Sequence, residues 1–390
     1  MRKFTIGFVL ILSFVVVGLS QSGRRIATKA TPIPTTIERA EDVYSESRPY
    51  KPVRVYPRDY KKKKKKKKKK SKKRSQKQAV TNQTTDDPDL IKVDSTLVTI
   101  PISVHDRNGL YIPDLRQNEI KIFEDGKEQE IAYFGSSEKP FTVVLLLDTS
   151  PSTEYRIEEI QRASRAFVDQ LKPEDSVMVI EFDANVHVLT EATKDRKKIY
   201  KAIRKADFGG GTSLYDAVEF SLEKRLEKIE GRKAIVLFTD GVDTTSRGAD
   251  YGENIVEMEE SDVLVFPIYY NTYLDNRRGR NPFPRRGGIF GRAPIGTRPE
   301  DYALGKQYLE ELAAVTGGRV FTPNKTPGGL TKAFEGIAEE LRRQYNIGYY
   351  PSKEGVPGER RKIKVRVYRP KLIIRARDSY IVGDNKVADN

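Results

Sequence analysis

The sequence predicts an α/β protein in which a doubly wound, mostly parallel sheet is inserted in, or flanked by, a small antiparallel β-sandwich. Continuous apolar runs alternate with amphipathic helical segments between residues 138 and 342. Segments that alternate strictly between apolar and polar residues precede this region and return after it. Strands that alternate with helices are typical of a parallel sheet covered by helices on both faces, whereas strict alternation indicates strands with one buried face.

Residues 1–20 are predicted to be a secretory signal peptide. Arg2 and Lys3 precede an apolar run at 4–17, and the small residues Gly18 and Ser20 stand just before Gln21. The alternative is a retained membrane anchor, for which the run is slightly short. We therefore expect a secreted or periplasmic protein, with association with the cell surface as a further alternative. The chain has no cysteine, which excludes a disulfide scaffold and a thiolate enzyme.

Residues 21–91 are predicted to be a disordered, lysine-rich linker. Lys61 begins a run of ten lysines that ends at Lys70, and residues 61–74 together hold thirteen positive charges. Because the whole chain has a net charge of +16, the remainder is nearly balanced, and we expect no nucleic-acid partner. The run is either a solvated spacer or a contact with an anionic surface such as lipopolysaccharide, acidic glycan or lipid.

Residues 92–137 are predicted to form an N-terminal β module. Val98, Ile100, Ile102 and Val104 alternate with more polar residues, and Asp125-Gly126 favours a tight hairpin turn. So small a module would bury too little core alone. Strands at 343–382 are expected to complete it, followed by a tail at 383–390.

The central region, residues 138–342, carries the predicted parallel sheet. Apolar stripes at helical spacing predict helices within residues 157–171, 214–229 and 330–341. An Arg-, Gly- and Pro-rich insertion at 271–299 interrupts the pattern and is predicted to be a disordered flap or a loop for a partner. Apolar runs predict strands at 142–147, 176–182, 186–189, 233–239, 263–270 and 319–322.

Oxygen-bearing side chains follow three of the predicted elements. Asp148, Ser150 and Ser152 come at the end of the first central strand, Thr212 follows three glycines before a helix, and Asp240 follows another apolar strand. Ligands gather at the carboxyl ends of strands in such sheets, and hard oxygen donors suit a divalent cation. A simpler interpretation of the glycine loop is a turn in which Thr212 or Ser213 caps the helix.

At these five positions the chain resembles a von Willebrand factor type A (vWA) domain, whose metal-ion-dependent adhesion site has the pattern Asp-x-Ser-x-Ser, a distant Thr and a distant Asp. The resemblance implies a Rossmann-like fold and a Mg²⁺ site, with Mn²⁺ or Ca²⁺ as alternatives, formed by Asp148, Ser150, Ser152, Thr212 and Asp240. It also implies that the two aspartates act largely through bound water and that one coordination position accepts a carboxylate from a partner. Residues 92–382 as a whole look like exported vWA-related proteins of acidobacteria.

The leading hypothesis is therefore a non-enzymatic, metal-dependent protein-binding module for adhesion or assembly, whose partner presents an Asp or Glu. One alternative is a structural or surface-associating envelope protein tethered by the lysine run, and another is a metal-assisted hydrolase. Asp183 and Asp243 could support the site, but they also suit turns. His105 and His187 are the only histidines and lie far apart in the sequence, which argues against a zinc site and a serine–histidine–aspartate triad.

Overall fold

The computed structural model describes residues 43–49, 97–108, 110–136, 140–151, 157–271, 296, 298–323, 328–353 and 355–382. The predicted signal peptide, the lysine run, nearly all of the 271–299 insertion and the tail lie outside these residues. Among the described helices, none is both long and apolar enough to cross a membrane.

A five-stranded sheet forms the centre of the predicted parallel region. Its strand order is β10-β9-β6-β7-β8, and every pair is parallel except β7 with β8. Successive side chains on a strand point to opposite faces, so the continuous apolar run of β6 fills two cores, with Val143 and Leu145 in one and Val144 and Leu146 in the other. The strands are β6 (Phe141–Asp148), β7 (Ser176–Phe182), β8 (Val186–Thr193), β9 (Arg232–Thr239) and β10 (Val263–Tyr269).

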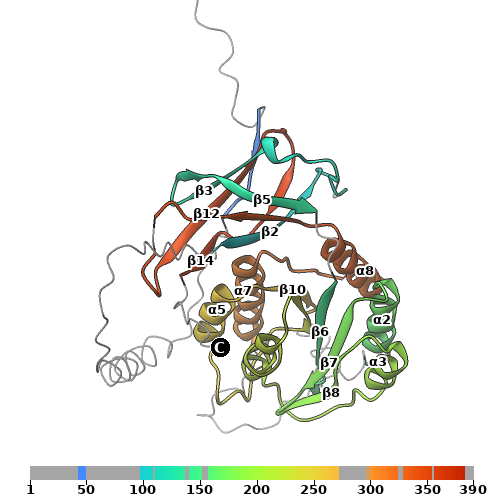
Figure 1. Cartoon of the computed structure of the whole chain (residues 1–390). Coiled ribbons are helices and arrows are strands. Elements are labelled where there is room, and N and C mark those ends of the chain that lie inside the picture. Colours follow the sequence, from blue (N-terminus) through green and yellow to red (C-terminus); the bar gives the residue numbers. More distant parts are fainter. Residues whose placement is uncertain are drawn as a thin grey trace, which may run out of the picture. The chain divides into compact units, whose positions relative to one another are not determined.

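Helices cover both faces of this sheet (Figure 1). On one face lie α2 (Ile157–Gln170), α3 (Arg196–Ile203) and α8 (Gly329–Arg342). The other face is covered by α4 (Leu214–Glu219), α5 (Tyr251–Glu260) and α7 (Pro299–Thr316). The doubly wound α/β fold class is therefore confirmed.

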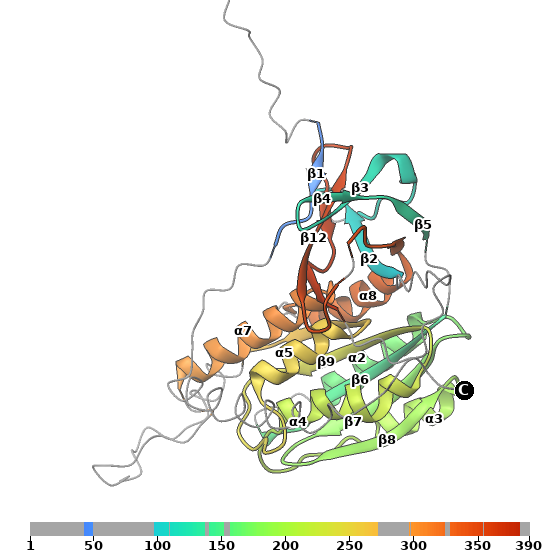
Figure 2. The ribbon, with the colours of Figure 1, turned by 60° about the vertical axis from the view of Figure 1, so that its left-hand side comes forward.

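Antiparallel strands form a sandwich of two sheets beside this domain (Figure 2). Strands that precede the central domain in the sequence pair here with strands that follow it: β11 lies between β2 and β5, and β12 pairs with β3. The first sheet contains β1 (Ser45–Glu46), β12 (Arg360–Val367), β3 (Ile120–Glu124), β4 (Lys127–Gln129) and β14 (Ser379–Ile381), and the second contains β13 (Ile373–Arg375), β2 (Val98–His105), β11 (Tyr345–Tyr349) and β5 (Ile131–Ser136).

The central domain contacts the sandwich through buried polar groups. Glu259 of α5 is only 1% exposed, pairs with Arg360 of β12 and accepts a 2.5 Å hydrogen bond from Ser379 of β14. Arg377 donates to the carbonyl of Ser261 at the end of α5. Because Glu259 and Arg377 are removed from water, their hydrogen bonds and the ion pair of Glu259 are what make this burial tolerable.

Three details differ from the sequence prediction. Residues 43–49 belong to the sandwich, although they fall inside the range predicted as a disordered linker, because backbone pairing and ion pairs with β12 hold this polar segment. Only Phe321 of the strand predicted at 319–322 forms a bridge, to Ile268. The helix predicted within 214–229 continues after α4 as a π-helical segment, Phe220–Arg225, and ends in a 3₁₀ turn, Leu226–Lys228.

Candidate metal centre

Asp148 is the last residue of β6 and lies at the carboxyl edge of the sheet. Its side chain is completely buried and accepts a 2.6 Å hydrogen bond at Oδ2 from the hydroxyl of Thr239, the last residue of the neighbouring β9. The other oxygen, Oδ1, accepts a 3.0 Å bond from the Ser150 amide. The parallel pairing of β6 with β9 brings these strand ends together, so that the Thr239 hydroxyl orients the carboxylate.

Ser150 lies next to this carboxylate in the loop that leaves β6. It is 1% exposed, and its hydroxyl hydrogen-bonds with Asp148. The preceding residue, Thr149, ties the loop to the end of β7, since its amide donates to the Phe182 carbonyl at 2.9 Å and its hydroxyl donates there at 3.2 Å. Thr149 thus fixes the loop to β7 directly before Ser150, the first hydroxyl ligand candidate.

Asp240 follows β9 directly and is 2% exposed. Its Oδ1 accepts a 3.1 Å bond from the Val242 amide, while the Gly241 amide donates to the Thr239 hydroxyl at 3.0 Å. The Thr239 hydroxyl therefore contacts both the Asp148 carboxylate and the backbone beside Asp240. One side chain between the two aspartates sets their relative position.

The glycine-rich loop that carries Thr212 is joined to both of these loops. The Gly209 amide donates to the Thr149 carbonyl at 3.1 Å. The Thr212 amide donates to the Thr244 hydroxyl at 2.8 Å, and the Thr244 amide returns a 2.8 Å bond to the Thr212 carbonyl. The loops carrying Asp148, Thr212 and Asp240 thus converge at one edge of the sheet.

Position 209 requires glycine, because the backbone there lies very close to the Asp183 side chain. A Cβ atom there would lie 1.4 Å from a carboxylate oxygen of Asp183, so no larger residue fits. Gly211 has a φ of 86°, which glycine adopts freely. These two glycines let the loop fold back far enough to place Thr212, which is 6% exposed, beside the loop that follows Asp240.

The two buried aspartates interact unfavourably when both are ionised. Burial raises the pKa of Asp148 to about 7, the negative charge of Asp240 adds to the increase, and the hydrogen bonds from Ser150 and Thr239 oppose it. A divalent cation would remove this repulsion, and carboxylate and hydroxyl oxygens are the donors that Mg²⁺ and Ca²⁺ prefer. The donor set therefore fits the predicted metal.

Four of the five predicted metal ligands can be placed. Asp148, Ser150, Thr212 and Asp240 lie on the converging loops, whereas Ser152 lies outside the described residues. Their assignment as ligands stays a prediction. Sequence reasoning missed Thr239 and Thr244, which position the loops; for Thr239 the available signal was its place at the end of β9, next to Asp240.

The two further acidic residues considered from the sequence serve local structure. Asp243 accepts hydrogen bonds from the Tyr215 amide at the start of α4 (3.3 Å) and from the Ser246 hydroxyl (2.5 Å). Asp183 accepts a 2.7 Å bond from the Asn185 amide and lies against Gly209. Both contacts stabilise loops beside the candidate centre.

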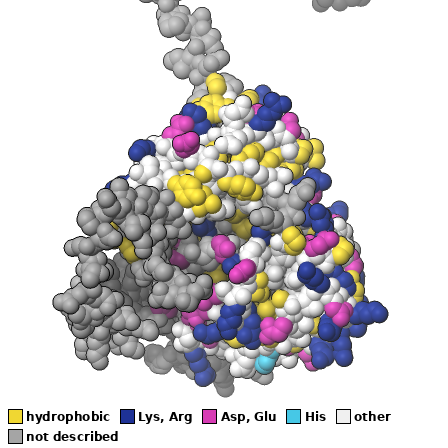
Figure 3. Space-filling view, viewed as in Figure 1, with side chains coloured by type: hydrophobic (Ala, Val, Ile, Leu, Met, Phe, Trp, Pro, Cys, Tyr) yellow, Lys and Arg dark blue, Asp and Glu magenta, His cyan; other side chains and the backbone are white. Residues whose placement is uncertain are grey.

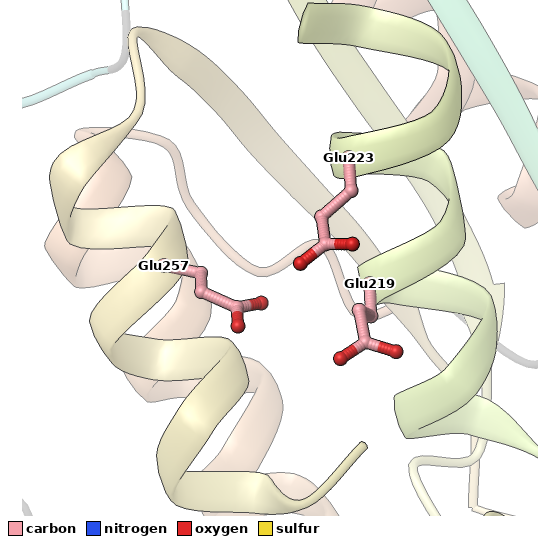
Figure 4. Close-up of side chains that lie close together, drawn as sticks. All are labelled: Glu219, Glu223 and Glu257. Atoms are coloured by element: carbon pink, nitrogen blue, oxygen red, sulfur yellow. The ribbon is translucent and has the colours of Figure 1, made fainter. Parts of the chain in front are cut away.

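A second acidic cluster lies away from the strand ends, between α4 with its π-helical extension and α5 (Figure 4). Carboxylate oxygens of Glu219, Glu223 and Glu257 lie within 4.8 Å of one another. Burial and the neighbouring carboxylates raise the pKa of Glu257 to about 7. The sequence analysis did not detect this cluster. Glu257 Oε2 has no hydrogen-bond partner among the described residues, but the side chain is only partly buried, so we assign no ligand to the cluster.

Comparisons with known proteins identify the central region. Residues 143–242 match the family profile of the von Willebrand factor type A domain. The uncharacterized protein sll0103 of Synechocystis sp. is 29% identical over 106 residues, which cover 26% of this chain and 25% of that protein. The chain thus spans about a quarter of the length of this curated relative.

Solved structures with a similar arrangement are more distant. BatB from Bacteroides thetaiotaomicron is 18% identical with a TM-score of 0.39, over 52% of this chain and 100% of that chain. A von Willebrand factor type A protein from Catenulispora acidiphila is 12% identical with a TM-score of 0.39, over 75% of this chain and 76% of that chain. At these values the two structures add no argument about activity or partners.

Proposed function

The chain contains a von Willebrand factor type A domain, and from that premise we propose that it is an exported, non-enzymatic module that binds a partner protein through a divalent cation. The single observation that carries the proposal is the pair of buried carboxylates, Asp148 and Asp240, at the carboxyl edge of the sheet, where the Thr239 hydroxyl links the Asp148 carboxylate to the Gly241 amide beside Asp240. Burying two like charges side by side is costly unless a cation compensates them.

Mg²⁺ is the cation that we propose, with Mn²⁺ or Ca²⁺ as alternatives. Asp148, Ser150, Thr212 and Asp240 would hold it together with Ser152. The bound cation would supply a Lewis-acidic centre for an Asp or Glu side chain of the partner. The hydroxyl ligands are neutral, so they would hold the ion without cancelling the charge that attracts this carboxylate.

The surrounding residues would prepare the site for this ion. Thr239 orients Asp148, and the reciprocal hydrogen bonds between Thr212 and Thr244 keep the glycine-rich loop against the loop that follows Asp240. Ordering these loops before binding would lower the entropic cost of capturing both ion and partner. Export is proposed from the predicted signal peptide at residues 1–20.

The proposal is tested by calorimetry and by a pull-down from envelope extract in Mg²⁺ and in chelator. Wild type should take up one cation per chain and retain a partner only with the cation, whereas Asp240→Asn and Thr212→Ala should do neither. The matched control is Asp262→Asn, since the Asp262 side chain is 71% exposed and precedes β10 at the opposite edge of the sheet.

Two outcomes would overturn the proposal. If folded wild type takes up none of the three cations, the proposed metal site is excluded. If a partner is retained equally well in chelator, a role of the metal in partner binding is excluded. Retention that instead disappears when the lysines of residues 61–70 are replaced by Gly and Ser, but persists in Asp240→Asn, would favour the alternative of an envelope protein that associates with an anionic surface.

A further inference from the structure

We infer that the edge of β12 is a strand-acceptor groove, which residues 43–49 fill in this structure and which would accept an extended acidic segment of a partner protein in their place. This site lies in the sandwich and does not depend on the proposed metal centre. Pairing of an extended segment with an exposed strand edge is a general mode of peptide recognition, in which backbone bonds give affinity and side-chain pockets give specificity.

The backbone of residues 43–49 already pairs with β12 as such a ligand would. Ser45 and Glu46 lie antiparallel to Val367 and Arg366, and the Ser47 amide donates to the Val365 carbonyl at 2.8 Å. On the same side of β12, the segment Arg360–Lys362 pairs with β14. Residues 43–49 and β14 therefore occupy successive parts of the same edge of β12, and the part that pairs with residues 43–49 is the groove.

Two serine hydroxyls form hydrogen bonds with the backbone groups that line the groove. Ser45 donates to the Arg369 carbonyl at 2.8 Å and accepts from the Leu372 amide at 2.9 Å. Ser47 accepts from the Val365 amide at 2.9 Å. Both serines are less than a tenth exposed, so the groove selects small hydroxyl side chains at these two positions.

Charge selects the residue between the serines. Glu46 contacts Arg366 at 2.7 Å and Lys364 at 3.2 Å. Burial alone would raise the pKa of Glu46, but hydrogen bonds from Arg366 and Lys364 outweigh it and leave the pKa lowered. The Arg366 guanidinium also lies 4.2 Å from the ring centre of Tyr44. The groove thus fits an aromatic residue, a serine, an acid and a second serine, in extended form.

Several features indicate that this occupant can be exchanged. The strand has only two residues in register with β12, and residues 50–96 separate it in sequence from the next described segment. So short a strand contributes few backbone hydrogen bonds to hold the segment against β12. Most of the exposed large hydrophobic residues also belong to the sandwich, where apolar side chains gather on the face seen in Figure 3. The sandwich is therefore a suitable docking surface.

The test uses the full-length protein and a labelled synthetic peptide with the sequence of residues 43–49. Glu46→Lys places a positive charge against Lys364 and Arg366 and should release the chain's own segment. Amide exchange at Val365 and Val367 should then accelerate, and fluorescence anisotropy should show peptide binding. Wild type should bind the peptide at least about tenfold more weakly, because its own segment occupies the groove.

Three controls make the result decisive. A peptide with Lys in place of Glu46 should not bind Glu46→Lys protein. The double variant Glu46→Lys with Arg366→Glu restores an opposite-charge pair and should regain slow exchange at Val365. Glu46→Gln is the milder variant, which keeps the test valid if Glu46→Lys does not fold. Folded protein with accelerated exchange but no peptide binding, or equal binding of both peptides, would overturn the inference.

Discussion

Gly241 and Gly305 pack backbone against backbone beside the candidate metal centre. A Cβ atom on Gly241 would lie 2.7 Å from the Gly305 carbonyl carbon, and one on Gly305 would lie 2.4 Å from the Gly241 carbonyl oxygen. The loop that begins at Asp240 therefore rests directly on α7. Its position depends on a helix that contributes no predicted metal ligand.

Gly305→Ala should push this loop away from α7 and weaken cation binding. Overpacking of this kind costs about 1–3 kcal/mol, so we expect a lower melting temperature and roughly tenfold weaker Mg²⁺ uptake by calorimetry. Gly210→Ala is the matched control, because a Cβ atom there meets nothing within 4 Å. Equal cation affinity of the two variants would show that α7 does not position Asp240.

The buried aspartates should give the cation-free protein an unusual dependence on pH. Burial and the charge of Asp240 raise the pKa of Asp148 from its ordinary 3.8 to about 7. The folded state then binds more protons than the unfolded state between these values, so this group's contribution to stability falls as pH rises from about 4 to about 7. The measurement is the free energy of unfolding, in chelator, of wild type relative to Asp148→Asn. Excess Mg²⁺ should remove the decline, and a flat difference in chelator would contradict the assigned repulsion.

Thr239→Val should damage the centre without removing a predicted ligand. The substitution keeps the side chain's shape but removes the hydroxyl that donates to Asp148 and accepts from the Gly241 amide. A buried polar group left without its partner costs about 1–3 kcal/mol, and we expect weaker cation binding together with this loss of stability. Thr239→Ser keeps the hydroxyl and should restore cation affinity in calorimetry. Failure of that rescue would argue against a positioning role.

A buried ion pair inside the sandwich should couple strongly in a double-mutant cycle. Arg361 and Glu124 are 2.6 Å apart and nearly unexposed, and Tyr349 and Tyr380 both donate to the same Glu124 oxygen. Arg361→Met leaves this carboxylate buried without its cation, which should cost about 3–5 kcal/mol in denaturant unfolding.

Adding Glu124→Gln to Arg361→Met should recover part of that loss, since the remaining amide carries no charge. The control is Lys362→Met on the same strand, where the side chain is exposed and the expected loss is smaller. Strictly additive effects of the two substitutions would contradict a direct interaction between the charges.

The features that the sequence alone determined are those that depend on local pattern. The run from Val143 to Leu147 is apolar on both faces of a strand, so helices had to cover both sides of the sheet. Asp148 and Asp240 each come at the end of such a run, and parallel strands end at a common edge of the sheet. The sequence alone therefore predicts that the two aspartates converge.

Only the tertiary structure decided the features that depend on partners distant in sequence. Thr239 and Gly305 matter because of what packs against them across the fold. The place of Thr239 beside Asp240 could be read from the sequence, but its hydrogen bond to Asp148 and the contact of Gly305 with Gly241 could not. Ser45 and Glu46 lie in a polar segment without periodicity, yet they form a strand because β12, more than 300 residues later, supplies backbone groups and two cations. Periodicity reports which face of an element is buried, whereas contacts between distant segments arise only when the whole chain has folded.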